Sequence, residues 1–276
     1  MAHQVVEIKT KDNVLIPCGI WDAGGDAILY LHGIESHMGW FKDMAEKLQE
    51  SGFSVYAIDR RGSGLSKEER GHIDSYRIIL DDIERVVEEM RSKRPGKKIF
   101  LMGICGGGKF AANFVSSHPN SVDGLILISP AIKAKVTLSP MKKLDVLFSS
   151  FFNPKKMIPT PLSYDMFTKN KKYIEFIKND SLSLHSLTAR FYRELAIMDA
   201  AVSRKIFNTK IPVLTVLAED DPIVNNDAMV KWHSRLKTGD KTIKLFNGCC
   251  HFLPFQDNLD DIVKFVAAWM KGKRGA

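Results

Sequence analysis

The sequence predicts an α/β fold: a mostly parallel sheet of about eight strands, with helices on both faces and an inserted helical cap. Two observations predict it. Short apolar runs alternate with amphipathic stretches of helical period along almost the whole chain. Continuous apolar runs without polar alternation are typical of parallel strands that are buried on both faces. The alternation stops only between Ala131 and Arg204, where no parallel strand is evident.

The part of the chain before this interruption supplies six expected strands and three expected helices. The strand candidates are residues 5–10, 14–21, 27–33, 53–59, 97–104 and 123–129. A turn at Lys11–Asn13 joins the first two strands, because Asp and Asn favour turns. Each helix candidate has one apolar stripe and ends at a glycine or a proline. The helix candidates are residues 39–52, 75–96 and 107–119.

The rest of the chain consists of the interruption and a second stretch of alternation. Amphipathic segments at residues 171–179 and 186–199 predict two helices in the interruption. The later candidates are strands at 211–220 and 242–248 and helices at 226–237 and 259–273. We therefore predict three parts, which are a first core segment at residues 1–131, a helical cap at 132–203 and a second core segment at 204–276.

The length and composition are those of a globular protein. The 276 residues fit one large domain with an inserted cap. Hydrophobic residues at 45% and charged residues at 26% are ordinary proportions. No apolar run is long enough to cross a bilayer, and the first residues lack the apolar core of a signal peptide. These features predict a cytoplasmic protein whose four cysteines are thiols.

The positive charge of the chain is concentrated in the expected cap. The net charge of the whole chain is +8. Between Ile132 and Asp180 the chain has ten lysines against four acidic residues. One interpretation is a solvated lysine-rich surface, and the other is peripheral contact with anionic lipid or an acidic carrier. No nucleic-acid partner is expected, since zinc-finger spacing, a basic zipper and an aromatic-basic RNA motif are all absent from the sequence.

The strongest chemical signal is the run GICGGG at residues 103–108, with Cys105 at its centre. It lies between an expected strand and an expected helix. So sharp a turn strains its central residue and leaves no room for side chains on its neighbours. A turn of this kind, usually G-x-S-x-G, presents a nucleophile above the sheet, and the N-terminus of the following helix favours a thiolate. The alternative is a glycine-rich turn around a buried, inert cysteine.

A cysteine nucleophile needs a base, and the base needs a group that orients it. In chains with this turn, the nucleophile is followed by an acid and then by a histidine. Asp221 ends one expected strand and His251 follows the next one. Asp220 is the rival acid, but Asp221 directly precedes a proline and suits the turn better. Two adjacent cysteines precede His251, yet adjacent residues rarely bind one metal ion together, so no metal and no cofactor is expected.

A third motif is the run His32-Gly33-Ile34 at the end of an expected strand. A His-Gly pair at this place opens a loop whose backbone N–H groups can face the nucleophile. We expect the N–H groups of Ile34 and Gly106 to point at one spot, where they would stabilise a carbonyl oxygen that becomes negative. His32 itself is expected to have a structural role.

These motifs resemble the monoacylglycerol lipase and lysophospholipase branch of the α/β-hydrolase superfamily over nearly the whole chain. The resemblance rests on HGIESH, DRRGSGLS at residues 59–66, GICGGG, HPNSVDGLILISPA, the DPIV turn, the loop of His251 and the cap segment NDSLSLHSLTARFYREL. It implies the α/β-hydrolase fold and structural roles for His37 and Arg61. Three positions depart from the family pattern: Cys105 replaces a serine, Gly106 a larger residue and Ser63 a histidine.

Together, these features predict two-step acyl chemistry on an ester or a thioester through a covalent acyl-cysteine. Because a thiolate leaves a tetrahedral intermediate more readily than an alkoxide, thiol or enolate leaving groups suit a cysteine nucleophile. Dienelactone hydrolases and polyhydroxyalkanoate synthases resemble this chain in placing cysteine at the turn. Hydrolysis is the first expectation, acyl transfer the second and a non-catalytic ligand sensor of the same fold the third. A cysteine introduced by design in place of serine would give the same sequence.

The expected cap is also rich in aromatic residues beside prolines. Phe148, Phe151, Phe152 and Phe191 are expected to line an apolar pocket over Cys105. This pocket would bind the apolar acyl chain of a small-molecule substrate. Packing within the cap is the alternative role for the four phenylalanines.

Overall fold

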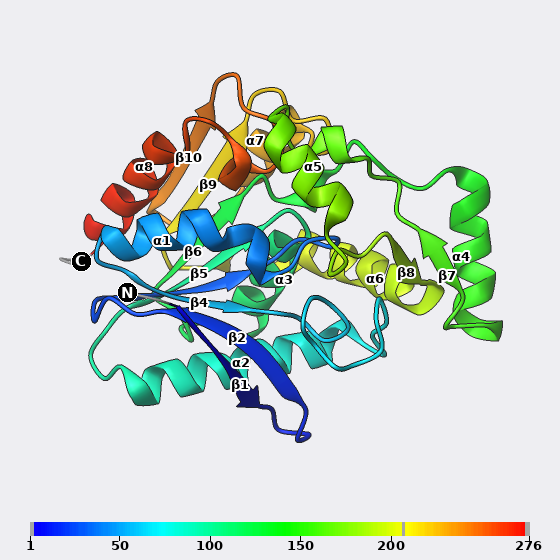
Figure 1. The fold of residues 1–276 in the computed structure, drawn as a ribbon, viewed down its shortest axis with the longest axis horizontal. Coiled ribbons are helices and arrows are strands. Elements are labelled where there is room, and N and C mark those ends of the chain that lie inside the picture. Colours follow the sequence, from blue (N-terminus) through cyan, green and yellow to red (C-terminus); the bar gives the residue numbers. More distant parts are fainter. Residues whose placement is uncertain (1–2, 206–207, 274–276) are drawn as a thin grey trace.

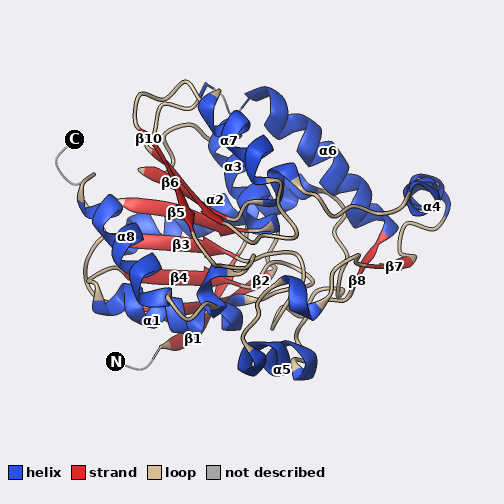
Figure 2. Ribbon diagram, turned by 90° about the horizontal axis from the view of Figure 1, so that it is seen from above, coloured by secondary structure: helices blue, strands red, loops and turns tan. Residues whose placement is uncertain are grey.

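The structure is a computed structural model that describes residues 3–205 and 208–273. Residues 1–2 of the first predicted core segment lie outside the described residues, as do residues 206–207 and 274–276 of the second. An eight-stranded sheet forms the centre of the fold, in the order β1-β2-β4-β3-β5-β6-β9-β10 (Figures 1 and 2). Its strands are β1 Gln4–Lys9, β2 Leu15–Trp21, β3 Ala27–Leu31, β4 Ser54–Ile58, β5 Ile99–Ile104, β6 Gly124–Ile128, β9 Val213–Ala218 and β10 Lys241–Phe246.

The direction of the strands confirms the predicted sheet. Strand β2 runs antiparallel to both of its neighbours, β1 and β4. All the other neighbouring strands of this sheet are parallel. The parallel strands therefore end at one edge, and loops that follow them meet there.

Helices cover both faces of the sheet, as the alternation predicts. Helices α1 (Lys42–Glu50) and α8 (Leu259–Lys271) lie together on one face (Figure 2). The helices on the other face are α2 Tyr76–Lys93, α3 Gly106–Ser117 and α7 Asn226–Ser234. The 3₁₀ helices are η1 Met38–Phe41, η2 Ala131–Lys133, η3 Tyr164–Met166 and η5 Leu253–Phe255.

We keep the name cap for residues 132–203. In this part the structure places α4 Pro140–Phe152, β7 Met157–Pro159, α5 Lys171–Asn179, β8 Ser186–Thr188 and the start of α6 Ala189–Lys205. Strands β7 and β8 pair only with each other among the described residues and contribute nothing to the large sheet. Helix α4 extends furthest from the sheet, at the right of Figure 1. Proline at the first position of α4 begins that helix, and Ser139 caps it by accepting the N–H of Lys142.

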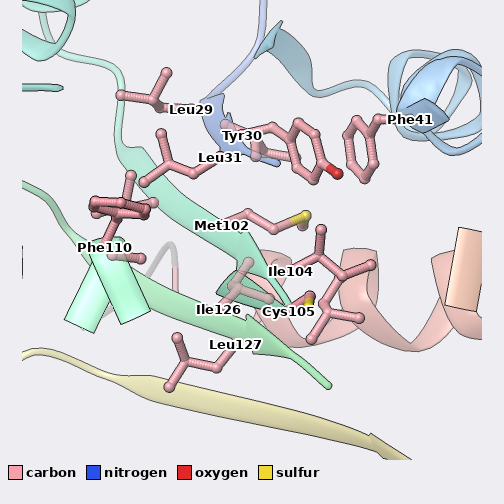
Figure 3. Close-up of a cluster of buried hydrophobic side chains, with 14 of the residues drawn as sticks. Leu29, Tyr30, Leu31, Phe41, Met102, Ile104, Cys105, Phe110, Ile126 and Leu127 are labelled. Atoms are coloured by element: carbon pink, nitrogen blue, oxygen red, sulfur yellow. The ribbon is translucent and has the colours of Figure 1, made fainter. Parts of the chain in front are cut away.

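The inner strands β3, β5 and β6 are fully buried because helices cover them on both sides. Their side chains form one continuous apolar core, part of which Figure 3 shows. Tyr30 and Phe41 stack there with ring centroids 3.6 Å apart. Cys105 lies at the end of this cluster, directly after β5 (Figure 3). The residue thus directly follows a fully buried strand of the core. Within the described ranges, no helix has the length and apolarity that crossing a bilayer requires.

Candidate active site

Cys105 lies at the apex of a strained turn between β5 and α3. Its backbone has φ 52° and ψ −119°, a conformation that residues other than glycine rarely adopt. Small neighbours make the turn possible. A Cβ atom on Gly103 would lie 2.5 Å from the carbonyl oxygen of Gly107, and a Cβ on Gly107 would collide with the carbonyl oxygen of Leu31. The Cys105 side chain is 5% exposed and stands above the parallel strands, at the N-terminus of α3.

Asp221 and His251 come together from the two loops that follow β9 and β10. The imidazole Nδ1 of His251 lies 2.8 Å from Oδ2 and 3.0 Å from Oδ1 of Asp221. Oδ1 also accepts the backbone N–H groups of Ile223 and Val224, at 2.8 and 2.9 Å. The carboxylate is therefore held in place and fixes the proton of the histidine on Nδ1. This leaves Nε2 as the nitrogen that can exchange a proton with a reacting group.

The rival acid points elsewhere. The carboxylate of Asp220 is paired with Lys169 of the cap, at 2.7 Å from its ammonium group, and makes no contact with His251 among the described hydrogen bonds and ion pairs. Asp221 is buried, whereas the Asp220 side chain is 44% exposed. The geometry thus selects Asp221 as the partner of the histidine.

The electrostatic surroundings of His251 join it to Cys105. His251 is fully buried, and burial lowers the pKa of an imidazole. The negative charges of Cys105 and Asp221, with the hydrogen bond that His251 donates to Asp221, outweigh burial and raise the pKa of His251 to about 10. Its Nε2 is buried and has no partner other than Cys105 among the described residues. A histidine in this setting holds a proton that it can deliver to a leaving group.

The two expected oxyanion donors lie beside each other. A Cβ atom built on Gly106 would lie 3.3 Å from the backbone nitrogen of Ile34. Neither N–H group donates a hydrogen bond to a described residue. Gly106 is the first residue of α3, where N–H groups have no partner within the helix. The pair can therefore bind a negative oxygen next to the sulfur of Cys105.

A cavity of about 750 Å³ opens over Cys105 between the core and the cap. Ile34, Gly106 and Cys105 form part of its wall. Apolar cap residues that line it include Val136, Leu138, Val146, Leu147, Leu162 and Leu195. Four cationic side chains also line it, from Lys109, Lys133, Lys143 and Arg193. The size and the apolar lining suit a single acyl chain.

The expectation that four phenylalanines line this cavity was wrong. The inner side of α4 presents Lys143, Val146 and Leu147 to the cavity. Phe148, Phe151 and Phe152 lie on the other side of the same helix and are 57%, 60% and 85% exposed. Phe191 is fully buried and packs against the guanidinium group of Arg60, 5.5 Å from its ring centroid. The inner and outer sides of α4 are both apolar, so the helical period alone did not distinguish them.

Two buried charged residues near the site were missed by the sequence analysis. Arg60 and Glu35 are 5% and 3% exposed. The only signal for either was its position inside a recognised motif, HGIESH for Glu35 and DRRGSGLS for Arg60. Their partners are largely backbone carbonyls and cap side chains from distant parts of the chain, which leave no local pattern.

Comparison with known proteins gives a consistent result. The Hydrolase_4 family model, described as serine aminopeptidase, S33, matches residues 25–258. Phospholipase YtpA of Bacillus subtilis is 29% identical over 88% of this chain and 93% of its own length. Monoglyceride lipase of Homo sapiens is 25% identical over 89% of this chain and 82% of its own length.

Solved structures show the same fold. A soluble variant of monoglyceride lipase from Saccharomyces cerevisiae, in complex with a substrate analog, has a TM-score of 0.85 and 19% identity, covering 100% of this chain and 97% of that one. Monoacylglycerol lipase of Paleococcus ferrophilus has a TM-score of 0.82 and 21% identity, covering 99% and 100%. At these identities the likeness concerns the fold alone, and it confirms the expected sheet and helices.

Proposed function

Because the chain belongs to the Hydrolase_4 family of α/β hydrolases, we propose that it hydrolyses acyl esters or thioesters through a covalent acyl-cysteine at Cys105. One arrangement carries the proposal: Cys105 stands at a strained turn in the wall of the cavity, and Asp221 holds a fully buried His251, whose pKa a negative charge on Cys105 raises. Nucleophile, base and orienting acid are thus electrostatically connected. Relatives named as monoglyceride lipases and a phospholipase support a lipid ester as the substrate.

The reaction follows from the positions of these groups. Nε2 of His251 takes the thiol proton, and the sulfur of Cys105 forms a bond to the acyl carbon. The carbonyl π electrons move to the oxygen, which accepts the N–H groups of Ile34 and Gly106. When the C=O bond re-forms, the leaving group departs and takes the proton from His251. Water then gives a proton to His251, and its oxygen forms a bond to the acyl carbon of the thioester. When the C–S bond breaks, the sulfur of Cys105 takes this proton back and the acid is released.

A cysteine at this turn favours particular substrates. In the tetrahedral intermediate an alkoxide competes poorly with the thiolate as leaving group, so alkyl esters often return to substrate. Thioesters and activated esters do not have this disadvantage. We therefore propose that a thioester is cleaved faster than an alkyl ester with the same acyl chain.

A matched pair of substrates tests the proposal. We would compare the decanoyl ester of glycerol with a decanoyl thioester in the wild type, Cys105→Ser and Cys105→Ala. The wild type is expected to prefer the thioester, Cys105→Ser to shift toward the ester, and Cys105→Ala to lose both activities. Free decanoic acid as product indicates hydrolysis, whereas a decanoyl ester of an added alcohol indicates transfer. Unchanged turnover in Cys105→Ala would refute the mechanism.

We further propose that the outer side of α4 contacts an anionic lipid surface. Met141, Leu144, Phe148, Phe151 and Phe152 recur at helical spacing and are all more than half exposed. Exposed apolar stripes of this kind mark interaction sites. Lys142, Lys155 and Lys156 are exposed in and just after the same helix and complement anionic headgroups, although Lys155 also pairs with Glu69 and Lys156 with Asp145. The cavity lies on the inner side of this helix, so a lipid leaving a surface would have a short path to Cys105.

A further inference from the structure

Arg60 is a buried cation behind the loop that supplies one oxyanion donor. It follows β4 by two residues, and its side chain is 5% exposed. The guanidinium group lies between the rings of Phe110 and Phe191, 5.5 Å from each centroid. The buried carboxylate of the adjacent Asp59 favours its charge, but the described residues show no direct ion pair between Arg60 and a carboxylate. A buried charge that forms no direct ion pair is costly, so the polar groups that it contacts must help to stabilise it.

These contacts are concentrated on two successive peptide groups. Nη1 of Arg60 donates to the carbonyl oxygen of Gly33 at 3.2 Å, and Nη2 donates to that of Ile34 at 3.2 Å. Nη2 also donates to the hydroxyl oxygen of Ser63, at 2.8 Å. Ser63 is fully buried and occupies the position where the family pattern has a histidine. The serine therefore completes the site of the arginine.

His32 holds the same carbonyl group from a second side. Its Nε2 accepts the backbone N–H of Arg60 at 3.0 Å, so the ring proton is on Nδ1. Nδ1 then donates to the carbonyl oxygen of Gly33 at 2.7 Å. The oxygen of Gly33 thus accepts two hydrogen bonds, one from His32 and one from Arg60.

The geometry of the peptide group transmits this anchoring to the active site. The Gly33–Ile34 bond is trans, because the described residues contain no cis peptide bond. In a planar trans peptide the N–H points opposite to the C=O. Because the oxygen of Gly33 points toward Arg60, the N–H of Ile34 points the opposite way, toward Gly106. The nitrogen of Ile34 lies 3.3 Å from the position that a Cβ atom on Gly106 would take.

We propose that Arg60 is a positioning residue that holds the Ile34 N–H in the oxyanion hole, with Ser63 and His32 as its supports. The inference rests on the proposed function, since it concerns the intermediate of that reaction. Arg60 touches neither substrate nor sulfur and acts through the Gly33–Ile34 peptide.

Arg60→Met and Arg60→Lys test this role. We expect Arg60→Met to lower kcat by about 100-fold, the effect of losing one oxyanion donor, with KM changed less than about threefold because ground-state binding needs no oxyanion. Arg60→Lys keeps the charge but cannot donate to both carbonyl oxygens, so its kcat should lie between those of the wild type and Arg60→Met. Ser63→Ala should cause a smaller loss. Arg94→Met is the matched control, because Arg94 is also buried against an aromatic ring but pairs with Asp22.

Alkylation by iodoacetamide separates positioning from general damage. It needs the cysteine and the histidine but no oxyanion hole, so the Arg60 variants should react at the wild-type rate. A kcat within threefold of wild type in a folded Arg60→Met would overturn the inference. An alkylation rate that falls as far as kcat would overturn it too. If the wild type cleaves no acyl substrate, the proposed function fails instead, before the Arg60 variants are compared.

Discussion

The side chain of Ile34 occupies the space that any side chain at position 106 would need. A Cβ atom on Gly106 would lie 2.5 Å from Cγ1 and 2.7 Å from Cδ1 of Ile34. The large residue of this pair, Ile34, is therefore on the loop after β3, and the small one, Gly106, directly follows Cys105. This arrangement explains why glycine can follow the nucleophile in this chain, where the family pattern has a larger residue.

Gly106→Ala should disturb the oxyanion hole, because Ile34 must move away from the new methyl group. We expect kcat/KM to fall about tenfold or more, and Ile34→Ala combined with Gly106→Ala to recover most of the loss, since contacting sites couple by up to a few kcal/mol. Gly239→Ala is the control, because no atom lies within 4 Å of its Cβ position. Additive effects of Ile34→Ala and Gly106→Ala would show that the two positions are independent.

Cys105→Ala should lower the pKa of His251. The cysteine contributes a negative charge that favours the protonated imidazole. With this charge removed, burial opposes protonation and only Asp221 supports it, so the pKa must move down from about 10. Titration of ¹⁵N-labelled histidine by NMR measures the value in both proteins. A pKa that is the same in wild type and Cys105→Ala would contradict the electrostatic connection between the two residues.

Glu35→Gln should stabilise the fold at high pH. Burial raises the pKa of Glu35 from its ordinary value of 4.5 to about 7, although Thr160 donates a hydrogen bond to it. His185 lies 3.9 Å from its other oxygen. When an acid has a higher pKa in the folded state than in the unfolded state, the free energy of unfolding falls as the pH rises from about 4.5 through about 7. The variant should therefore gain up to about 3 kcal/mol of unfolding free energy at pH 8, and no ionisation-related gain at pH 4.

Chemical denaturation at the two pH values measures this difference. Glu88→Gln serves as control, because Glu88 is exposed and forms no ion pair in the described residues. The same gain at pH 4 and pH 8 would mean that ionisation of Glu35 is not its cause.

Removal of exposed phenylalanines from α4 should weaken binding to lipid vesicles. Phe148→Ser with Phe152→Ser is expected to lower the partition coefficient about tenfold or more, since burying one phenylalanine contributes about 1.5–3 kcal/mol. Lys142→Gln should matter only when phosphatidylglycerol is added to phosphatidylcholine, and less at high salt. Val230→Ser is the control, because Val230 is 48% exposed on α7. Equal losses in all variants would argue against α4 as the contact surface.

The turn at Cys105 and the candidate residues Asp221 and His251 could be predicted because each has a recognisable local sequence around it. Only glycine fits at positions 103 and 107 in so tight a turn, and Cys105, Asp221 and His251 occur in the order expected of chains with this turn. The strand and helix periods also predicted the eight-stranded sheet and the helices on its two faces, and the structure confirms both. In these segments, residue pattern and surroundings agree.

The cap could be predicted less well, because its residues depend on long-range packing. Helix α4 is apolar on two sides, so Leu147 and Phe148 are alike in the sequence, yet one lines the cavity and the other is exposed. Arg60 was missed for a related reason. Its partners are the carbonyl oxygens of Gly33 and Ile34, and backbone groups carry no identity that a sequence could reveal.

Acylation of Cys105 is the central claim, and intact-mass spectrometry under single-turnover conditions tests it most directly. The protein is mixed with a decanoyl thioester and quenched rapidly with acid. Its intact mass is then measured, and the modified residue is located by peptide mapping. We predict a transient mass increase of one decanoyl group on the peptide that contains Cys105, sensitive to hydroxylamine and absent from Cys105→Ala. Release of the thiol in a burst without this adduct, or an adduct on another residue, would contradict the account.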